Sequence, residues 1–548
     1  MNDLLAHFPE GATPRDEQVA LLRTLGAAFD AVEGDEGRAH VFVVEAPPGV
    51  GKSHLAMTLA RWSGDAYLLT SQKLLQDQYE RDFGDALQLV KGRENYLCER
   101  YPAHLRMTTT QGLCRRPRSP ACQCPYVRAK VAALNGPIFC TNTPYFLTLR
   151  QWQREQLRRR RLLVIDEAHN LEAQLVRVFT IAFPPDQMKA WFGGPLPRFD
   201  RADDYRMLFE DHVSRLQAAL ALIEKRLDAL RPPDVDPDAL LTYPLTAEEQ
   251  ELLAQRDHLE GALARLQFFV DAEDTEWIVR YPDDPFATLE LVPLTVGAMA
   301  GALLWDAADI VVLSSAFLGR REVIASYFGL ADDEVHAFAG ASPFPVERRA
   351  IEYRPVGALS KATLSALEPA LFGEVGAILA AHGREKGLVH AGSYAAARRL
   401  LGSLAAHAPE QHRRVIFVES SEAKRRALEH HRASPLPTVL LSPSLREGVD
   451  LPDDFLRFQI VTKMPYPDLG DPWTAARQAR DPRWYALETA KALVQAYGRS
   501  CRHADDYGVT YILDAQFARF VQRYRPLLPG WFRDAAEPAL RAARARGG

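Results

Sequence analysis

The feature that most constrains this chain is a loop of small residues set between an apolar run and a helix-like run. Residues 41–45 read VFVVE, residues 46–53 read APPGVGKS, and residues 54–62 resemble a helix. Small residues and glycines let backbone N–H groups surround phosphate oxygens at the positive end of a helix. The loop is a Walker A element with Ala46 in place of its first glycine. It predicts a phosphate-binding α/β domain, because a plain glycine-rich turn rarely falls between a strand and a helix.

The Walker A element gives a role to each of its later residues. Lys52 is expected to reach the β- and γ-phosphates, and the Ser53 hydroxyl is expected to bind Mg²⁺. The backbone that surrounds the phosphates belongs to Pro48, Gly49, Val50 and Gly51.

A second apolar run, residues 162–166, leads into Asp166-Glu167-Ala168-His169. A carboxylate at the C-terminal end of a parallel strand lies beside the phosphate loop, so Asp166 is expected to hold Mg²⁺ through its waters. Glu167 is then placed to polarise the water that attacks the γ-phosphate. The alternative is a charged strand end that only caps the next helix, and the presence of the Walker A element argues against it.

Two arginines near the C-terminus suggest a second side to this site. Residues 495–502 read QAYGRSCR, with Arg499 and Arg502 three residues apart. That spacing predicts that both guanidinium groups lie on one face of a helix. Arginines from a separate domain can stabilise the charge that spreads over a γ-phosphoryl group, provided that the two domains close on the nucleotide. Isolated surface arginines would simply be solvated.

Short runs rich in Val, Ile and Leu alternate with helix-like runs in both halves of the chain. The first group comprises residues 41–45, 66–70, 162–166 and 310–314, and the second comprises residues 387–391, 415–418, 438–442, 458–462 and 509–514. Such runs predict parallel sheets covered on both faces, and the two groups predict two α/β domains. Apolar residues at helical spacing over 213–230 and 252–270 predict an antiparallel helical pair inserted between strands of the first α/β domain.

Composition and charge exclude some classes of protein. Of the 548 residues, 47% are hydrophobic and 25% are charged, as in ordinary globular proteins. No apolar run approaches the roughly 18–20 residues that span a bilayer, and the N-terminus lacks the pattern of a secretion signal. We therefore expect a cytoplasmic protein with no membrane partner.

The formal net charge is −5, yet residues 91–130 hold nine Lys or Arg against two Glu, together with four of the six cysteines.

In order and spacing, these elements resemble the motifs of the XPD/DinG family of superfamily 2 helicases over most of the chain. The matching segments are Phe8-Pro9 with Gln18, an adenine-side element; residues 70–76, motif Ia; residues 166–169, motif II; residues 313–318, motif III; residues 342–345, a turn into the second motor domain; residues 447–450, motif V; and residues 495–502, motif VI. The resemblance implies that Gln18, Asp450, Gln495 and Gly498 contact the nucleotide. Phe317 departs from the family, which usually has Thr there.

The most distinctive match to the family lies in residues 91–130, which we call the basic island. Cys98, Cys114, Cys122 and Cys124 correspond to the cysteines that hold a [4Fe–4S] cluster in the family, and such a cluster needs four thiolates. Zinc is the alternative, but the spacing lacks the paired CxxC knuckles typical of structural zinc sites. The other two cysteines are interpreted as structural thiols.

The resemblance implies an α/β chain of two RecA-like motor domains, the first interrupted by a cluster insert and a helical arch. The expected boundaries are 1–90, 138–180 and 280–330 for motor domain 1, 91–137 for the iron–sulfur insert, 181–279 for the arch and 331–548 for motor domain 2. It further implies an ATP-dependent DNA helicase, a monomer that uses ATP, Mg²⁺ and the cluster, moves 5′→3′ on single-stranded DNA and unwinds forked or tailed duplexes. Basic residues of the island would track phosphates, and Tyr96, Tyr126 or Tyr145 could stack on bases.

Two other functions remain open. An ATP-gated nucleic-acid clamp would hydrolyse ATP without processive strand separation, and Phe317 is the feature that favours it. A metabolic P-loop ATPase would show no stimulation by single-stranded DNA, and it leaves residues 70–76, 447–450 and 495–502 without a role.

Overall fold

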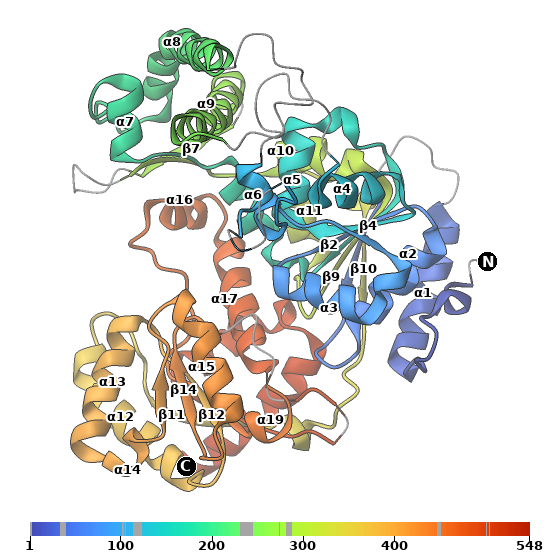
Figure 1. Cartoon of the computed structure of the whole chain (residues 1–548). Coiled ribbons are helices and arrows are strands. Elements are labelled where there is room, and N and C mark those ends of the chain that lie inside the picture. Colours follow the sequence, from blue (N-terminus) through green and yellow to red (C-terminus); the bar gives the residue numbers. More distant parts are fainter. Residues whose placement is uncertain are drawn as a thin grey trace.

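The computed structural model describes residues 3–32, 40–100, 104, 106–112, 123–230, 245–272, 275–280, 288–445, 451–499, 501–503 and 505–547. These residues form two α/β lobes and a smaller unit dominated by helices α7, α8 and α9, which lies beside the first lobe (Figure 1). The expected fold class, two RecA-like α/β domains, is confirmed.

A seven-stranded sheet forms the first lobe, and its paired strands all run parallel. Their order is β10-β1-β9-β5-β2-β4-β3. The bounds are β1 His40–Glu45, β2 Ala66–Thr70, β3 Gln88–Leu89, β4 Ile138–Asn142, β5 Arg160–Asp166, β9 Ala308–Ser315 and β10 Val335–Ala339. The four strands expected in the first half of the chain are all present. Their apolar side chains are buried on both faces, as a parallel sheet between helical layers requires.

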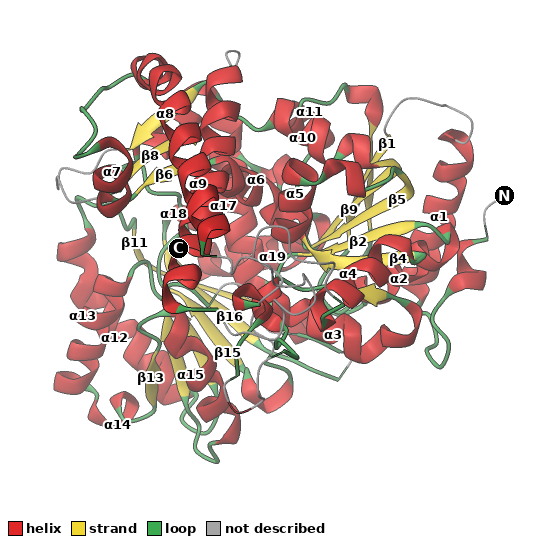
Figure 2. Cartoon of the chain, turned by 45° about the horizontal axis from the view of Figure 1, so that its top comes forward, coloured by secondary structure: helices red, strands yellow, loops and turns green. Residues whose placement is uncertain are grey.

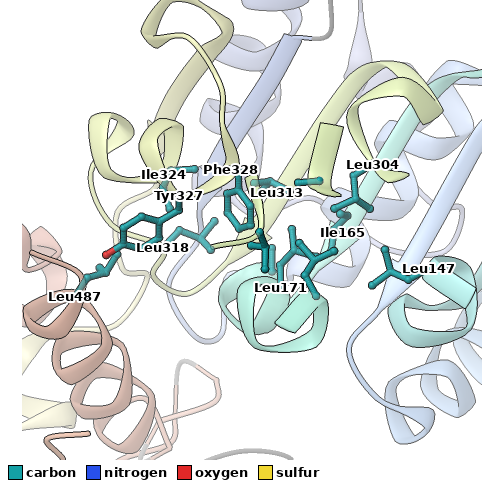
Figure 3. Close-up of a cluster of buried hydrophobic side chains, with 14 of the residues drawn as sticks. Leu147, Ile165, Leu171, Leu304, Leu313, Leu318, Ile324, Tyr327, Phe328 and Leu487 are labelled. Carbon is teal, nitrogen blue, oxygen red and sulfur yellow. The ribbon is translucent and has the colours of Figure 1, made fainter. Parts of the chain in front are cut away.

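Helices cover both faces of this sheet (Figure 2). They are α1 Asp16–Val32, α2 Lys52–Ser63, α3 Lys73–Phe83, α4 Pro125–Asn135, α5 Thr143–Trp152, α6 Leu171–Phe179, α10 Gly297–Leu303 and α11 Arg321–Phe328. Figure 3 shows Ile165 of β5, Leu171 of α6 and Leu313 of β9 in one buried cluster. Leu487, from helix α17 (Pro482–Tyr497) of the second lobe, and Tyr327 belong to the same cluster. The hydrophobic core therefore continues across the boundary between the lobes.

The second lobe is built on a six-stranded parallel sheet with the order β11-β16-β15-β12-β14-β13. Its strands are β11 Ile351–Gly357, β12 Gly387–His390, β13 Val415–Phe417, β14 Val439–Ser442, β15 Phe458–Val461 and β16 Val509–Asp514. Its helices are α12 Leu364–Ala381, α13 Tyr394–His407, α14 Pro409–His412, α15 Ser421–Ala433, α16 Pro472–Arg480, α17 Pro482–Tyr497, α18 Gln516–Arg523 and α19 Gly530–Gly547. All five strands expected in the second half are present. The additional strand, β11, was not expected, although Ile351 and Tyr353 alternate with the polar Glu352 and Arg354.

Helix α12 qualifies the statement that no segment is apolar enough to span a bilayer. Its 18 residues have a mean hydropathy of 1.4, so by length and composition alone it could cross a membrane. Leu371, Val375 and Ile378 of this helix are buried in the core of the second lobe, together with residues of its sheet. These residues pack one side of the helix against the core of the second lobe, while 22% of the helix as a whole is buried.

The smaller unit contains α7 Pro185–Phe192, α8 Ala202–Ala229 and α9 Ala247–Asp271, in which α8 and α9 pack along each other (Figure 1). This confirms the helical pair. Three short strands, β6 Ile181–Phe183, β8 Leu289–Pro293 and β7 Trp277–Arg280, form an antiparallel sheet at its base.

Two expected domain boundaries differ from the structure. The boundary at residue 280 cuts the antiparallel sheet, because β8 lies after this boundary and pairs with β6 and β7. The boundary at residue 330 falls too early, because β10 pairs with β1 in the first sheet. The pairings of β8 with β6 and of β10 with β1 join residues distant in sequence, which local patterning does not reveal.

Candidate nucleotide site between the lobes

The Walker A loop joins the end of β1 to the start of α2 and depends on two glycines. Gly49 has φ +81° and Gly51 has φ +86°, a left-handed conformation that glycine adopts without steric cost. A Cβ on Gly49 would lie 2.2 Å from the ring of Phe344, in the 342–345 turn at the start of the second lobe. Pro48 is in close contact with Gly498, since a Cβ on Gly498 would lie 2.8 Å from the ring of Pro48. The loop is therefore packed directly against the second lobe.

Residues of α1 support the loop from behind. The buried Gln18 amide donates a hydrogen bond to the Gly51 carbonyl at 3.2 Å, and its oxygen accepts the Arg15 N–H at 2.8 Å. The Arg15 guanidinium donates to the Gly49 carbonyl. Gln18 thus contacts the phosphate loop itself. Arg15 was not predicted as a site residue from the sequence. The only available signal was its position three residues before Gln18.

The motif II carboxylates follow β5 and face the Walker A lysine. Lys52 Nζ lies 3.5 Å from Glu167 Oε1, and His169 Nδ1 lies 3.1 Å from Glu167 Oε2. Asp166 is buried, and its Oδ2 accepts a hydrogen bond from the Tyr79 phenol at 3.0 Å. Glu167 has φ +53°, which is uncommon for a residue with a side chain and is typical of functional sites.

The two neighbouring carboxyls have opposite pKa shifts. Burial, with the adjacent Glu167 carboxylate, raises the pKa of Asp166 to about 6. Burial also acts to raise the pKa of Glu167, but Lys52 and His169 outweigh it and hold that pKa below its ordinary value. Glu167 is therefore ionised at neutral pH, as a group that orients and deprotonates water must be. A divalent cation beside Asp166 would favour its ionised form.

Arg499 and Arg502 do not lie on a helix, which corrects the sequence-based expectation. Helix α17 ends at Tyr497, and Arg499 follows in a turn while Arg502 lies in the loop beyond. Gly498 ends the helix, as glycine commonly does. Arg499 nevertheless lines the same cavity as Glu167 of the first lobe, and its charge helps to lower the pKa of that carboxyl.

One cavity of about 440 Å³ brings these predicted residues together across the lobes. Its walls include Gly49, Gly51, Lys52, Ser53, Asp166 and Glu167 from the first lobe and Gln495, Arg499 and Arg502 from the second. Val50 is buried beneath the loop. Asp450, with the rest of residues 447–450, lies outside the described part of the chain. The geometry can hold a polyphosphate between Lys52 on one side and two guanidinium groups on the other.

Motif III is tied to the site by a carboxylate that the sequence did not single out. Glu45, the last residue of β1, accepts the N–H groups of Leu318 and Gly319, both at 2.8 Å. His169 Nδ1 lies 2.9 Å from the Ser315 hydroxyl. Phe317 is buried in the core, so this position supplies packing and no polar contact. A charge at the end of an otherwise apolar strand was the available signal for Glu45.

Two of the four expected cluster ligands lie within the described residues. Cys98 and Cys124 are both buried, whereas Cys114 and Cys122 lie outside the described part. Within the described ranges no group of three or more His, Cys, Asp or Glu could hold a metal ion. Burial raises the pKa of Cys140 to about 12, as expected of a thiol buried in the core.

The tyrosines of the insert pack against one another. Tyr126 of α4 is buried, and its hydroxyl lies 2.8 Å from that of Tyr145 on α5. Tyr96 meets the Tyr126 ring edge-on, with centroids 5.8 Å apart, and the Arg93 guanidinium lies 4.4 Å from the centroid of that ring. Of the three tyrosines named as candidates for stacking, Tyr126 therefore offers no free face to bases, and the three rings together join the insert to the first lobe.

Comparisons with known proteins agree with this geometry. Residues 378–535 match the family model described as a helicase C-terminal domain. The ATP-dependent helicase DinG of Mycobacterium tuberculosis is 25% identical over 473 residues, which cover 77% of this chain and 68% of that protein. The ATP-dependent DNA helicase DinG of Photobacterium profundum is 28% identical over 266 residues, or 43% of this chain and 36% of that protein.

Solved structures show the same fold. An XPD helicase superimposes with a TM-score of 0.60 at 15% identity, covering 94% of this chain and 98% of that one. Xpd4 of S. tokodaii superimposes with a TM-score of 0.56 at 15% identity, covering 93% and 98%.

Proposed function

We propose that this chain, a superfamily 2 helicase of the XPD/DinG type, hydrolyses ATP to move along single-stranded DNA and separate duplexes. The observation that carries the proposal is the cavity between the lobes, which Lys52, Asp166 and Glu167 share with Arg499 and Arg502. A site completed by residues of both lobes makes hydrolysis depend on how the lobes are placed, and a motor needs this dependence.

Each side chain has a defined task in the proposed reaction. Lys52 exchanges its ion pair with Glu167 for the β- and γ-phosphates, which frees the Glu167 carboxylate to orient a water and take its proton. That water's oxygen bonds to the γ-phosphorus while the bond to the β-γ bridging oxygen breaks, so that ADP and phosphate leave. Arg499 and Arg502 stabilise the negative charge on the transferred group.

Ser53 and Asp166 would hold Mg²⁺, since a hydroxyl and a carboxylate at the cavity wall are oxygen ligands of the kind it prefers. When bound, the ion neutralises charge on the β- and γ-phosphate oxygens. Gln18 fixes the loop through the Gly51 carbonyl, and Gln495 lines the cavity from the second lobe.

A [4Fe–4S] cluster held by Cys98, Cys114, Cys122 and Cys124 belongs to the same proposal. Cys98 and Cys124 fit such a group, because both thiols are buried within the insert and sulfur ligands suit iron–sulfur clusters. The cluster would tie together the described elements of the insert, which are η3 Arg93–Asn95, η5 Thr109–Gln111 and α4.

The proposed track is single-stranded DNA, entered from a forked or tailed duplex and followed 5′→3′ by a cytoplasmic monomer. The resemblance supports the polarity, and the excess of basic residues over 91–130 supports a phosphate-tracking surface near the insert.

Strand displacement on tailed duplexes tests this function. The wild-type protein is expected to unwind a 5′-tailed duplex with ATP and Mg²⁺ and to leave a 3′-tailed duplex intact. Lys52→Ala is expected to abolish unwinding while DNA binding persists, and Lys361→Ala, at an exposed position of the second lobe, serves as the matched control. DNA-stimulated hydrolysis without strand displacement would favour the ATP-gated clamp. The buried Phe317 in motif III is the feature that supports this alternative. Hydrolysis that DNA does not stimulate would contradict both.

A further inference from the structure

Tyr79 reaches the catalytic centre from a helix that no expectation connected with it. Tyr79 lies on α3 and is completely buried, and its phenol donates to Asp166 Oδ2 at 3.0 Å. Its partner Asp166 is thus one of the two side chains proposed to hold Mg²⁺, and the other, Ser53, lines the same cavity as Asp166.

We propose that Tyr79 is the positioning residue of the magnesium site and that α3 links this site to the basic insert. The inference rests on the proposed function. Asp166 Oδ1 accepts the Glu167 N–H at 2.9 Å, so the Tyr79 hydroxyl is the donor that fixes the other carboxylate oxygen. Donors that orient a ligating carboxylate commonly matter as much as ligands, and losing one typically costs about 10–100-fold in metal affinity.

The ring and the hydroxyl of Tyr79 have separable tasks. The ring packs in the core with Phe83, their centroids 5.7 Å apart, and this contact needs no hydroxyl. A buried hydroxyl must find a partner, and here it finds Asp166. Tyr79→Phe therefore removes the positioning contact and keeps the packing.

The same helix is fastened to the root of the insert. Lys91, the first residue of the insert, has its ammonium 2.7 Å from Asp77 and 2.9 Å from Glu80, both on α3. The Lys73 ammonium at the start of α3 lies 2.8 Å from Glu94.

A buried amide makes a further link between α3 and this root. Gln76 is completely buried and donates to the Val90 carbonyl at 3.2 Å, immediately before the insert. It also accepts a hydrogen bond from Asn142 of β4 at 3.0 Å. A displacement of the insert is consequently transmitted along α3 to Tyr79 and the Asp166 carboxylate.

Manganese binding tests the positioning role without requiring unwinding. Mn²⁺ is titrated into the full chain with substoichiometric ADP, and the free ion is measured by electron paramagnetic resonance. Tyr79→Phe is expected to weaken Mn²⁺ binding by about tenfold or more. Tyr67→Phe is the matched control, because this buried phenol donates at 2.7 Å to the Arg158 carbonyl, elsewhere in the same lobe. Equal Mn²⁺ affinities in wild type and Tyr79→Phe would overturn the positioning role.

Two further measurements complete the test. DNA-stimulated ATPase of Tyr79→Phe is expected to recover at high Mg²⁺ concentration, because only the metal affinity is impaired; a turnover that stays low would instead indicate a structural role and overturn the inference. Lys91→Met is expected to weaken Mn²⁺ binding about two- to fivefold, in keeping with a partly exposed ion pair. In the double variant, Lys91→Met should cause no further loss of Mn²⁺ affinity beyond that of Tyr79→Phe. A loss in the double variant equal to the product of the two single losses would overturn the link through α3. Absence of unwinding with these shifts present would refute the helicase and leave the metal site standing.

Discussion

Replacing Arg477 with Met should loosen the contact between the two lobes more than any surface substitution. Arg477 of α16 is 4% exposed and Glu172 of α6 is 6% exposed. The guanidinium contacts Glu172 Oε1 at 2.9 Å and 3.3 Å, and the Trp484 indole N–H donates to Oε2 at 3.0 Å. The guanidinium also lies 4.9 Å from the centroid of the Tyr327 ring. Without Arg477, a buried carboxylate retains only the indole as its hydrogen-bond donor among these contacts.

The expected loss follows from that geometry. Removing one partner of a buried pair costs about 3–5 kcal/mol, because the remaining charge stays desolvated. Arg477→Met combined with Glu172→Gln removes both charges and keeps an oxygen for Trp484, so about 2–3 kcal/mol should return. An exposed pair would contribute only about 0–1 kcal/mol.

The assay is urea unfolding followed by tryptophan fluorescence, applied to both single variants and the double variant. The midpoint of unfolding should move to lower urea concentration in Arg477→Met and partly return in the double variant. A loss below about 1 kcal/mol in Arg477→Met would show that this pair is solvated and would refute the argument from burial.

Three further predictions concern the site and the insert. Arg499→Ala should lower the ATP turnover number about a thousandfold while nucleotide affinity changes little, because the guanidinium acts on charge that develops in the transition state. Turnover assays and nucleotide titration measure the two quantities. An equal loss of turnover and of affinity would instead assign Arg499 to binding of the ground state. Gly49→Ala should weaken nucleotide binding, because the left-handed backbone costs about 1–2 kcal/mol and the new Cβ meets Phe344 at 2.2 Å; Phe344→Leu should restore part of it, and wild-type affinity in the single variant would contradict the contact. Cys98→Ser should lose iron and unwinding while basal ATPase persists; a colourless wild-type protein with stoichiometric zinc after anaerobic purification would contradict the cluster.

Local sequence was sufficient for the parts of the site built by consecutive residues. The phosphate loop follows from a strand, two glycines and a helix in one short stretch, and Asp166 follows from its place at the end of a buried strand. The nine strands expected in the two sheets were predictable for a similar reason, since each contains a continuous apolar run, whereas β3, β10 and β11 lack one and were not predicted.

Contacts between distant residues could not be predicted in this way. Tyr79 and Asp166 are 87 positions apart, and Glu172 and Arg477 are 305 apart, so no window of sequence contains either pair. The two arginines of motif VI were placed on a helix because their spacing fits one, whereas Gly498 ends that helix first. The fold nevertheless brings the end of α17, and with it both arginines, to the cavity beside the phosphate loop.

A structure of the protein with ADP and a γ-phosphate analogue such as beryllium fluoride tests the central claim most directly. The account predicts the analogue within hydrogen-bonding distance of Lys52 from the first lobe and of Arg499 or Arg502 from the second. An analogue held by the first lobe alone, with both arginines turned to solvent, would contradict it.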